Sequence, residues 1–170
     1  MSSDVNYEYR TGIGTDIHRL VTGRDLVLGG VKIPYKEGLL AHSDGDVVLH
    51  AVIDALLGAA GMGDIGGLFP DTDDKWKDAD SRELLQIVKG RLEEKKWEVV
   101  NVDLIVHAEQ PKLGEVKGQI KRCVSSILGI DFINVNVKAK TNEGLGDVGS
   151  GKAMASTVTV LLRRRIKRTL

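Results

Sequence analysis

The sequence predicts an α/β (α+β) two-layer sandwich, in which a mixed β-sheet is covered by one layer of about three helices. Strand-like stretches rich in β-branched residues flank three helical stretches. The 170 residues suit one domain with a real core and leave no room for two. No linker, low-complexity run or internal repeat divides the chain. We therefore expect a single domain over residues 1–170.

The first half of the chain is expected to form two short strands and one buried helix. Residues 8–14 and 26–33 have strand patterns. Residues 44–60 are the strongest helix candidate, and Ser43 followed three residues later by Asp46 resembles a capping box. Apolar residues surround most of this helix, so it should be largely buried.

The second half of the chain should alternate helices with strands. A polar, glycine-containing stretch covers 61–79, and an amphipathic helix follows from about 80 to 97. The later patterns predict a strand at 99–107, a helix at 112–128, a strand at 133–140 and a final strand at 155–162.

The composition argues against several classes of function. The 24 basic and 24 acidic residues cancel, so no field of one sign points to nucleic acid or an anionic membrane as a partner. No stretch approaches the roughly 18 apolar residues of a membrane span. Residues 1–8 lack the features of a signal peptide, so we expect a cytoplasmic protein. We interpret the basic run at 163–168 as a solvated end, and Cys123 as a buried, inert thiol.

Three ionisable residues recur on one face of the predicted helix at 44–60. Asp46, His50 and Asp54 follow one another at i, i+4 and i+8 and form a polar stripe. Burying such groups is costly unless they are paired or bind a metal ion. A stripe that faces solvent is the alternative.

The Asp16-x-His18 pair adds two further candidate ligands where the first strand is expected to end. Alternate residues of an extended segment point to the same side, so this carboxylate and this imidazole can converge. With His50 they make three ligands of the types that zinc prefers and leave a fourth position open, as in catalytic zinc sites. On its own, an Asp-x-His pair can equally cap a turn.

Polar groups near the start of the helix at 44–60 suit a phosphorylated polyol. The backbone N–H groups of a helix N-terminus favour anions, so His42 and Ser43 can present donors to a phosphate oxygen. The alternative is that Ser43 only caps the helix and His42 lies on the surface. The candidate polyol contacts are Asp64, Ile65, Gly66, Phe69, Pro70, Asp71, Thr72 and Asp73. A loop of Asx-turns is the alternative for the run at 69–73.

These residues belong to longer motifs that follow one another from about residue 12 to 146. The motifs are Asp16-Ile17-His18, Gly29-Gly30-Val31-Lys32-Ile33-Pro34, Ala41-His42-Ser43-Asp44-Gly45-Asp46, Gly63-Asp64-Ile65-Gly66, Leu68-Phe69-Pro70-Asp71-Thr72-Asp73, Ala79-Asp80-Ser81-Arg82, Gln110-Pro111-Lys112 and Val135-Asn136-Val137-Lys138-Ala139-Lys140-Thr141-Asn142-Glu143. In this order they resemble the 2-C-methyl-D-erythritol 2,4-cyclodiphosphate synthase family.

The resemblance implies a role for each group of residues. Asp16, His18 and His50 would hold zinc, whose open position takes a phosphate oxygen of the substrate. His42 and Thr141 match positions that stabilise the transition state, and the candidate polyol contacts, with Ile17, would meet the erythritol phosphate end. The implied cytidine and diphosphate pocket consists of Ala108, Glu109, Gln110, Pro111, Lys112, Leu113, Gly114, Lys140, Thr141, Asn142 and Glu143, with Glu143 on a magnesium or manganese ion.

The resemblance also implies a reaction and an assembly. In that reaction the substrate's 2-phosphate attacks the β-phosphorus of its own cytidine diphosphate, which closes a ring and expels cytidine monophosphate. Two polyanionic groups must approach, so cations and positioning should carry most of the rate. Members of the family act in the non-mevalonate route to isoprenoid precursors, as homotrimers with active sites between subunits.

The stretch at 146–152 departs from the family pattern and suggests an alternative. Asp147 and Ser150 stand where many members have an aromatic residue and an arginine near the trimer axis, and Lys140 stands where threonine is common. The stretch also has the spacing of a nucleotide-binding P-loop. However, Ala153 lacks the metal-binding hydroxyl, and too little chain follows for that fold, so we expect a loop between two strands. A zinc-dependent phosphohydrolase and a non-catalytic metal-binding module are further alternatives.

Overall fold

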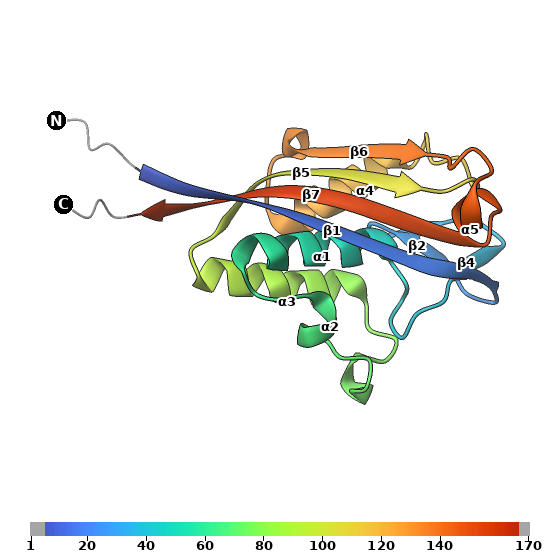
Figure 1. Cartoon of the computed structure of the whole chain (residues 1–170), viewed down its shortest axis with the longest axis horizontal. Coiled ribbons are helices and arrows are strands. Elements are labelled where there is room, and N and C mark those ends of the chain that lie inside the picture. Colours follow the sequence, from blue (N-terminus) through green and yellow to red (C-terminus); the bar gives the residue numbers. More distant parts are fainter. Residues whose placement is uncertain (1–5, 167–170) are drawn as a thin grey trace.

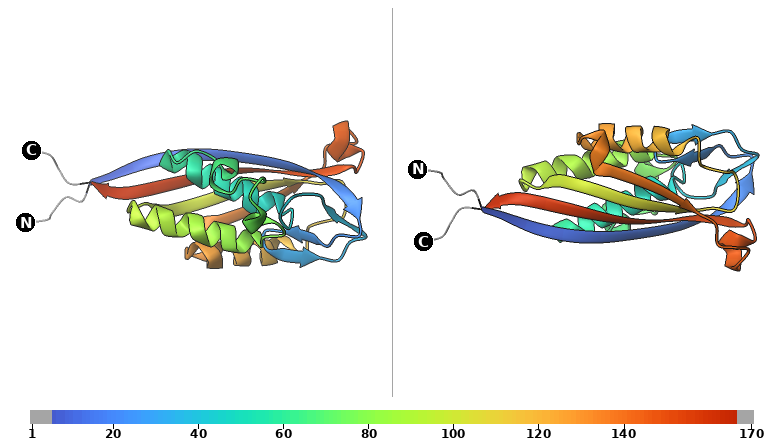
Figure 2. Two further views of the ribbon diagram at one scale, coloured as in Figure 1. Left: turned by 90° about the horizontal axis from the view of Figure 1, so that it is seen from below. Right: turned by 90° about the horizontal axis from the view of Figure 1, so that it is seen from above.

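The computed structural model describes residues 6–166; the predictions for the first five residues and for 167–168 lie outside this part. A mixed five-stranded sheet carries three main helices on one face (Figures 1 and 2), which confirms the predicted two-layer sandwich. The strands, in spatial order, are β4 (Glu37–Leu39), β1 (Asn6–Thr22), β7 (Ala153–Ile166), β5 (Glu98–His107) and β6 (Val135–Lys140).

The sheet is antiparallel except at one edge. β1 runs antiparallel to β4 and β7, and β7 runs antiparallel to β5. β5 and β6 are parallel, and the chain between them forms helix α4 (Lys117–Leu128). Parallel neighbours need such a crossover, because a tight turn cannot join strands that run the same way.

The helical layer covers one face of the sheet and leaves the other bare. Helix α1 (Val47–Ala60) packs on β1 and β7, and α4 packs on β6. Helix α3 (Ser81–Glu94) packs against both helices. Ile13 alternates along β1 with Gly12 and Gly14, which face α1, so Ile13 and Ile17 lie on the side of the sheet away from the helices, where they are 66% and 57% exposed.

Strand β1 is much longer than the predicted strand at 8–14. Its pairing with β7 extends from Asn6 opposite Ile166 to Arg19 opposite Ala153. This long-range partner supplies hydrogen bonds that the local pattern does not reveal, so the strand continues through a segment with weak strand propensity. Asp16 and His18 therefore lie within β1, and the expectation that the strand ends there is wrong.

The predicted strand at 26–33 is a hairpin of two shorter strands. β2 (Leu26–Leu28) and β3 (Val31–Ile33) pair around Gly29 and Gly30, whose φ angles are +61° and +75°. Positive φ at both central residues suits a two-residue hairpin turn. Strand β4 was not predicted, since three residues carry too little pattern to be recognised.

The predicted helices exist, with corrected starts. Asp46, not Ser43, caps α1, because its carboxylate accepts hydrogen bonds from the N–H groups of Val48 and Leu49. Asp80 caps α3 near the predicted start, whereas α4 begins at Lys117 rather than at 112.

The segments expected to be loops contain short helices. The stretch at 61–79 holds α2 (Ile65–Leu68) and η1 (Asp74–Trp76), and α5 (Gly146–Gly149) lies in the stretch between β6 and β7. The strand predicted at 133–140 begins only at Val135, because η2 (Phe132–Asn134) occupies its first two residues. No helix within residues 6–166 is long and apolar enough to span a membrane.

Two further expectations need correction. Arg163 and Arg164 belong to β7 and pair with Glu98 and Glu8, so this part of the basic run is strand rather than a solvated end. Cys123 is half-buried rather than buried, although burial still raises the pKa of its thiol and favours the unreactive, protonated form.

Candidate active site

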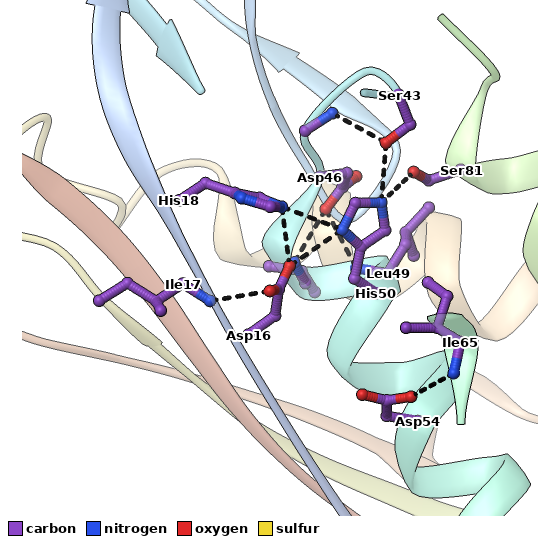
Figure 3. Close-up of polar contacts among 12 residues, drawn as sticks. Asp16, Ile17, His18, Ser43, Asp46, Leu49, His50, Asp54, Ile65 and Ser81 are labelled. Carbon is purple, nitrogen blue, oxygen red and sulfur yellow. Dashed lines mark hydrogen bonds and ion pairs between the residues drawn. The ribbon is translucent and has the colours of Figure 1, made fainter. Parts of the chain in front are cut away.

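Three potential metal ligands converge between β1 and α1 (Figure 3). Asp16 and His18 point from β1 toward the helical layer, and His50 points back from α1. The Asp16 Oδ2 atom lies 2.9 Å from His50 Nδ1 and 3.1 Å from His18 Nε2. Ligand atoms of all three residues lie within 4.8 Å of one another, so this group could hold a metal ion.

Close packing of α1 on β1 creates this convergence. Gly14 lies against α1, and a Cβ atom there would come within 2.0 Å of the Ala51 carbonyl oxygen. Gly12 meets the Ala55 carbonyl oxygen at the same distance. Because two glycines in alternate positions let the helix backbone approach the strand, His50 comes within reach of Asp16.

The charges at this centre are strongly coupled. Burial opposes ionisation of Asp16, but hydrogen bonds from His18 and His50 outweigh it and hold the pKa of that carboxyl well below its usual range. Burial likewise opposes the charged form of His50, but the hydrogen bond to Asp16 raises the pKa of that imidazole. A carboxylate and two imidazole nitrogens that face one another are a donor set suited to zinc.

The other two residues of the polar stripe on α1 lie outside this centre. The buried Asp46 carboxylate accepts N–H groups of Gly29 at 2.8 Å and Gly30 at 2.6 Å, which ties the β2–β3 hairpin to α1. Asp54 accepts the N–H of Ile65 at 2.7 Å and so positions α2. Of the three stripe residues, only His50 has its side chain at the candidate metal centre.

A cavity of about 400 Å³ opens beside the three ligands. Its lining includes Asp16, His18, Ala41, His42, Ser43, His50, Ile65, Gly66, Phe69, Pro70, Asp71, Trp76 and Leu84. Most of the residues expected to contact a polyol phosphate are thus brought to the candidate metal centre. His42 Nε2 is buried and has no hydrogen-bond partner within residues 6–166, so a ligand oxygen would satisfy it.

Three candidate polyol contacts do not line this cavity. Asp64 caps α2 by accepting the N–H of Gly67, and Asp73 caps η1 by accepting that of Lys75. Thr72 is exposed. The Asx-turn alternative therefore describes Asp73 correctly in this structure.

Sequence reasoning missed Trp76 in the cavity wall. The Trp76 ring meets Phe69 edge to face, with 4.8 Å between the ring centroids. A tryptophan in an otherwise polar segment was a signal for it, since so large an aromatic side chain gains much from burial against other groups.

The residues expected to bind cytidine and diphosphate gather at the ends of β5 and β6. Glu109 holds this region together, because its carboxylate accepts the N–H of Asn142 at 2.8 Å and of Gly144 at 3.3 Å. The Thr141 hydroxyl donates to Glu143 at 2.5 Å. None of these residues lines the cavity at the candidate metal centre, and Asn142 shares only a second hollow with Asp16. One chain therefore does not join the two groups into one pocket.

A mixed sheet and a helix packed on it, which together present two histidines and one carboxylate beside a cavity, define a candidate metal-dependent enzyme. Residues 9–163 match the YgbB family, and the chain belongs to this family. The resemblance seen in the sequence is confirmed: the 2-C-methyl-D-erythritol 2,4-cyclodiphosphate synthase of Bordetella avium is 54% identical over 157 residues, which cover 92% of this chain and 97% of that protein.

Solved structures share the fold. The bifunctional IspDF from Campylobacter jejuni superposes with a TM-score of 0.90 at 44% identity, over 94% of this chain. This chain spans 43% of that longer protein. The IspF of Plasmodium falciparum, solved as a complex with CDP, has a TM-score of 0.82 at 36% identity, over 93% of this chain and 97% of that one.

Proposed function

We propose that the chain is a 2-C-methyl-D-erythritol 2,4-cyclodiphosphate synthase, a phosphorus–oxygen lyase of the non-mevalonate route to isoprenoid precursors. It converts 4-diphosphocytidyl-2-C-methyl-D-erythritol 2-phosphate to the cyclic diphosphate and releases cytidine monophosphate. The observation that carries the proposal is the convergence of Asp16, His18 and His50 beside the 400 Å³ cavity, in a chain 54% identical to a synthase of that name.

We assign the three converging side chains to zinc. When bound there, the ion would neutralise phosphate charge and leave one coordination position for a phosphate oxygen. The Ser43 hydroxyl and the unpartnered His42 Nε2 lie beside it in the cavity wall and would hold the 2-phosphate as it approaches the β-phosphorus. The backbone of Ile65 and Gly66 would contact the erythritol hydroxyls.

The second cation, magnesium or manganese, would bind at Glu143. Its carboxylate is exposed and already paired with the Thr141 hydroxyl, so both groups face the same ligand region. A hard cation prefers such oxygen ligands and would bridge to the diphosphate. Thr141 would orient that diphosphate, while the segments 108–114 and 140–143 would enclose the cytidine. The cytoplasmic location expected from the sequence remains a prediction.

We further propose a homotrimer in which two chains share each site. The bare sheet face with Ile13 and Ile17 supports it, because exposed apolar residues on a strand favour burial against another copy. The separation of Glu143 from the cavity within one chain also supports it. Light scattering should give about three times the 18.5 kDa chain mass.

A mixing experiment tests the shared site. His50→Ala and Glu143→Gln chains, each strongly impaired alone, should regain activity when co-expressed. About one site in four would then combine a native His50 with a native Glu143 from the neighbouring chain. Homotrimers purified separately are the control. Absence of any recovery in verified mixed trimers would contradict the shared site.

Phosphorus NMR tests the reaction itself. The zinc-loaded protein, incubated with the cytidine-diphosphate substrate and magnesium, should release cytidine monophosphate and form one cyclic diphosphate in equal amounts. Formation of inorganic phosphate or of an open-chain bisphosphate would instead indicate attack by water, as in a phosphohydrolase.

A further inference from the structure

His50 makes its contacts with two buried serines through the ring nitrogen that faces away from the candidate metal centre (Figure 3). Its Nε2 atom lies 3.0 Å from Ser81 Oγ and 3.1 Å from Ser43 Oγ. Ser81 opens helix α3 and is fully buried, whereas Ser43 precedes α1 and lines the cavity. Two hydroxyls thus compete for one nitrogen.

The Asp44 carboxylate decides which way the hydrogen bonds run. The Ser81 hydroxyl lies 2.5 Å from Asp44 Oδ1, and the Ser81 N–H donates to Asp44 Oδ2 at 3.0 Å. An ionised carboxylate can only accept, so the Ser81 hydroxyl must donate its proton to Asp44. The lone pairs of the Ser81 oxygen are then left to accept a proton from His50.

The state of the His50 ring follows from this direction. If Ser81 accepts, Nε2 of His50 carries a proton and donates it. Without a metal ion, Nδ1 also carries a proton and donates it to Asp16 at 2.9 Å. A cation would displace that proton and meet the lone pair of Nδ1, while Nε2 keeps its proton for Ser81. The ring is thereby held in the tautomer and orientation that a cation between these residues requires.

We propose that Ser81 and Asp44 are positioning residues that fix His50 for metal binding through Nδ1. This inference rests on the proposed zinc site. Histidine ligands commonly donate their second N–H to such an outer partner, which sets the ring orientation and increases ligand basicity. The assignment also separates the two serines, because it leaves the hydroxyl proton of Ser43 free for a phosphate oxygen in the cavity.

Zinc affinity of serine variants tests the assignment, measured by competition with a chromophoric chelator. Ser81→Ala should weaken zinc binding by about 10- to 100-fold, the usual effect of losing an outer partner. Asp44→Asn should weaken it as well, because its single acceptor oxygen cannot serve both Ser81 donors. Ser43→Ala should retain zinc affinity within about twofold of the native value, since Ser81 still accepts from His50.

Ser125→Ala is the matched control. Ser125 is also a buried helical serine, but its hydroxyl donates to the Arg122 carbonyl oxygen on α4 and makes no contact with His50. Its removal should leave zinc affinity unchanged. Circular dichroism of each variant would establish that the fold is retained.

A spectroscopic measurement separates positioning from general stability. In the zinc-loaded, ¹⁵N-labelled protein, the His50 Nε2–H proton should be visible and protected from exchange with water. In Ser81→Ala this resonance should move upfield and exchange faster, while Ser125→Ala should leave it in place.

Two outcomes distinguish this inference from the function on which it rests. Native protein without zinc affinity would overturn the proposed metal site itself. If the native protein and Ser81→Ala bind zinc with equal affinity, only the assignment of Ser81 is overturned. The same holds if Ser43→Ala alone loses zinc.

Discussion

The two parts of the candidate active site differ in how far one chain completes them. At the candidate metal centre, β1 and α1 hold Asp16, His18 and His50 together, and the buried Ser81 hydroxyl contacts the His50 ring. At the ends of β5 and β6, Glu143 is exposed and its φ angle is +51°, a region that non-glycine residues rarely adopt. The first part is preorganised by packing, whereas the second part presents polar groups that need a ligand or a neighbouring chain.

The largest expected effect comes from removing a ligand in the preorganised part. His50→Ala should lower zinc affinity by about 1,000-fold or more, equivalent to about 4 kcal/mol, because two ligands hold zinc poorly. Metal analysis and the chelator competition measure the loss, and circular dichroism should show an unchanged fold. Full zinc occupancy in this variant would remove His50 from the site.

Packing, rather than the ligands, is tested by two glycine substitutions. Gly14→Ala should destabilise the chain by about 3 kcal/mol, because the new methyl group meets the Ala51 carbonyl oxygen on an α1 backbone that cannot easily move. In the other part, a Cβ at Gly114 meets nothing within 4 Å, so Gly114→Ala should change stability by less than about 0.5 kcal/mol.

Urea unfolding of the zinc-free proteins measures both values. Equal losses of unfolding free energy at the two glycines would contradict the contrast between a tightly packed metal centre and an open region at the ends of β5 and β6.

Sequence reasoning singled out the three candidate ligands that the structure brings together, because their chemistry is visible in local patterns. Asp16 and His18 alternate along a strand, and His50 interrupts an apolar helix, so each is conspicuous where it stands. The length of β1 was missed because β7, its partner, lies at the far end of the chain. The fold class was predictable from the alternation of elements, but pairing order was not.

The outer partners of His50 were not predictable in the same way. Ser81 is 31 residues from His50 and 37 from Asp44, and no local period relates them. The sequence around Ser81 indicates only that it is the first residue of a helix. Only tertiary packing of α3 against α1 gives its hydroxyl a second role, and a single sequence carries no signal for that contact.

A smaller effect is expected in the open part of the site. Glu143→Gln should lower kcat/KM for release of cytidine monophosphate by about 100-fold, or about 2.7 kcal/mol, because a neutral amide is a poor ligand for a hard cation. Lys152→Ala, beyond α5, should stay within about tenfold of the native protein.

Assaying the two variants side by side also tests the P-loop alternative. That alternative makes Lys152 essential and Glu143 dispensable. If Lys152→Ala were inactive and Glu143→Gln active, the P-loop alternative would replace the assignment of Glu143 to the second cation.

The smallest effect is the pH dependence of the free energy of unfolding of the zinc-free protein, which is on the order of 1 kcal/mol. The pKa of Asp16 is depressed in the folded state, so its stabilising effect is present above the unfolded value near pH 4 and is lost as the pH falls. The pKa of His50 is raised, so its effect is complete below the unfolded value near pH 6.5 and is lost as the pH rises through the folded value. The free energy of unfolding, relative to Asp16→Asn, should therefore be largest between about pH 4 and 6.5.

Zinc should reverse the decline of the unfolding free energy on the high-pH side. Metal binding requires the deprotonated ring of His50, so stabilisation by zinc should grow from about pH 6 to 8, where the zinc-free ion pair weakens. Urea titrations at several pH values, with and without zinc, measure both trends, and Asp16→Asn should show neither. Parallel profiles with and without zinc would mean that the ion does not bind at these side chains.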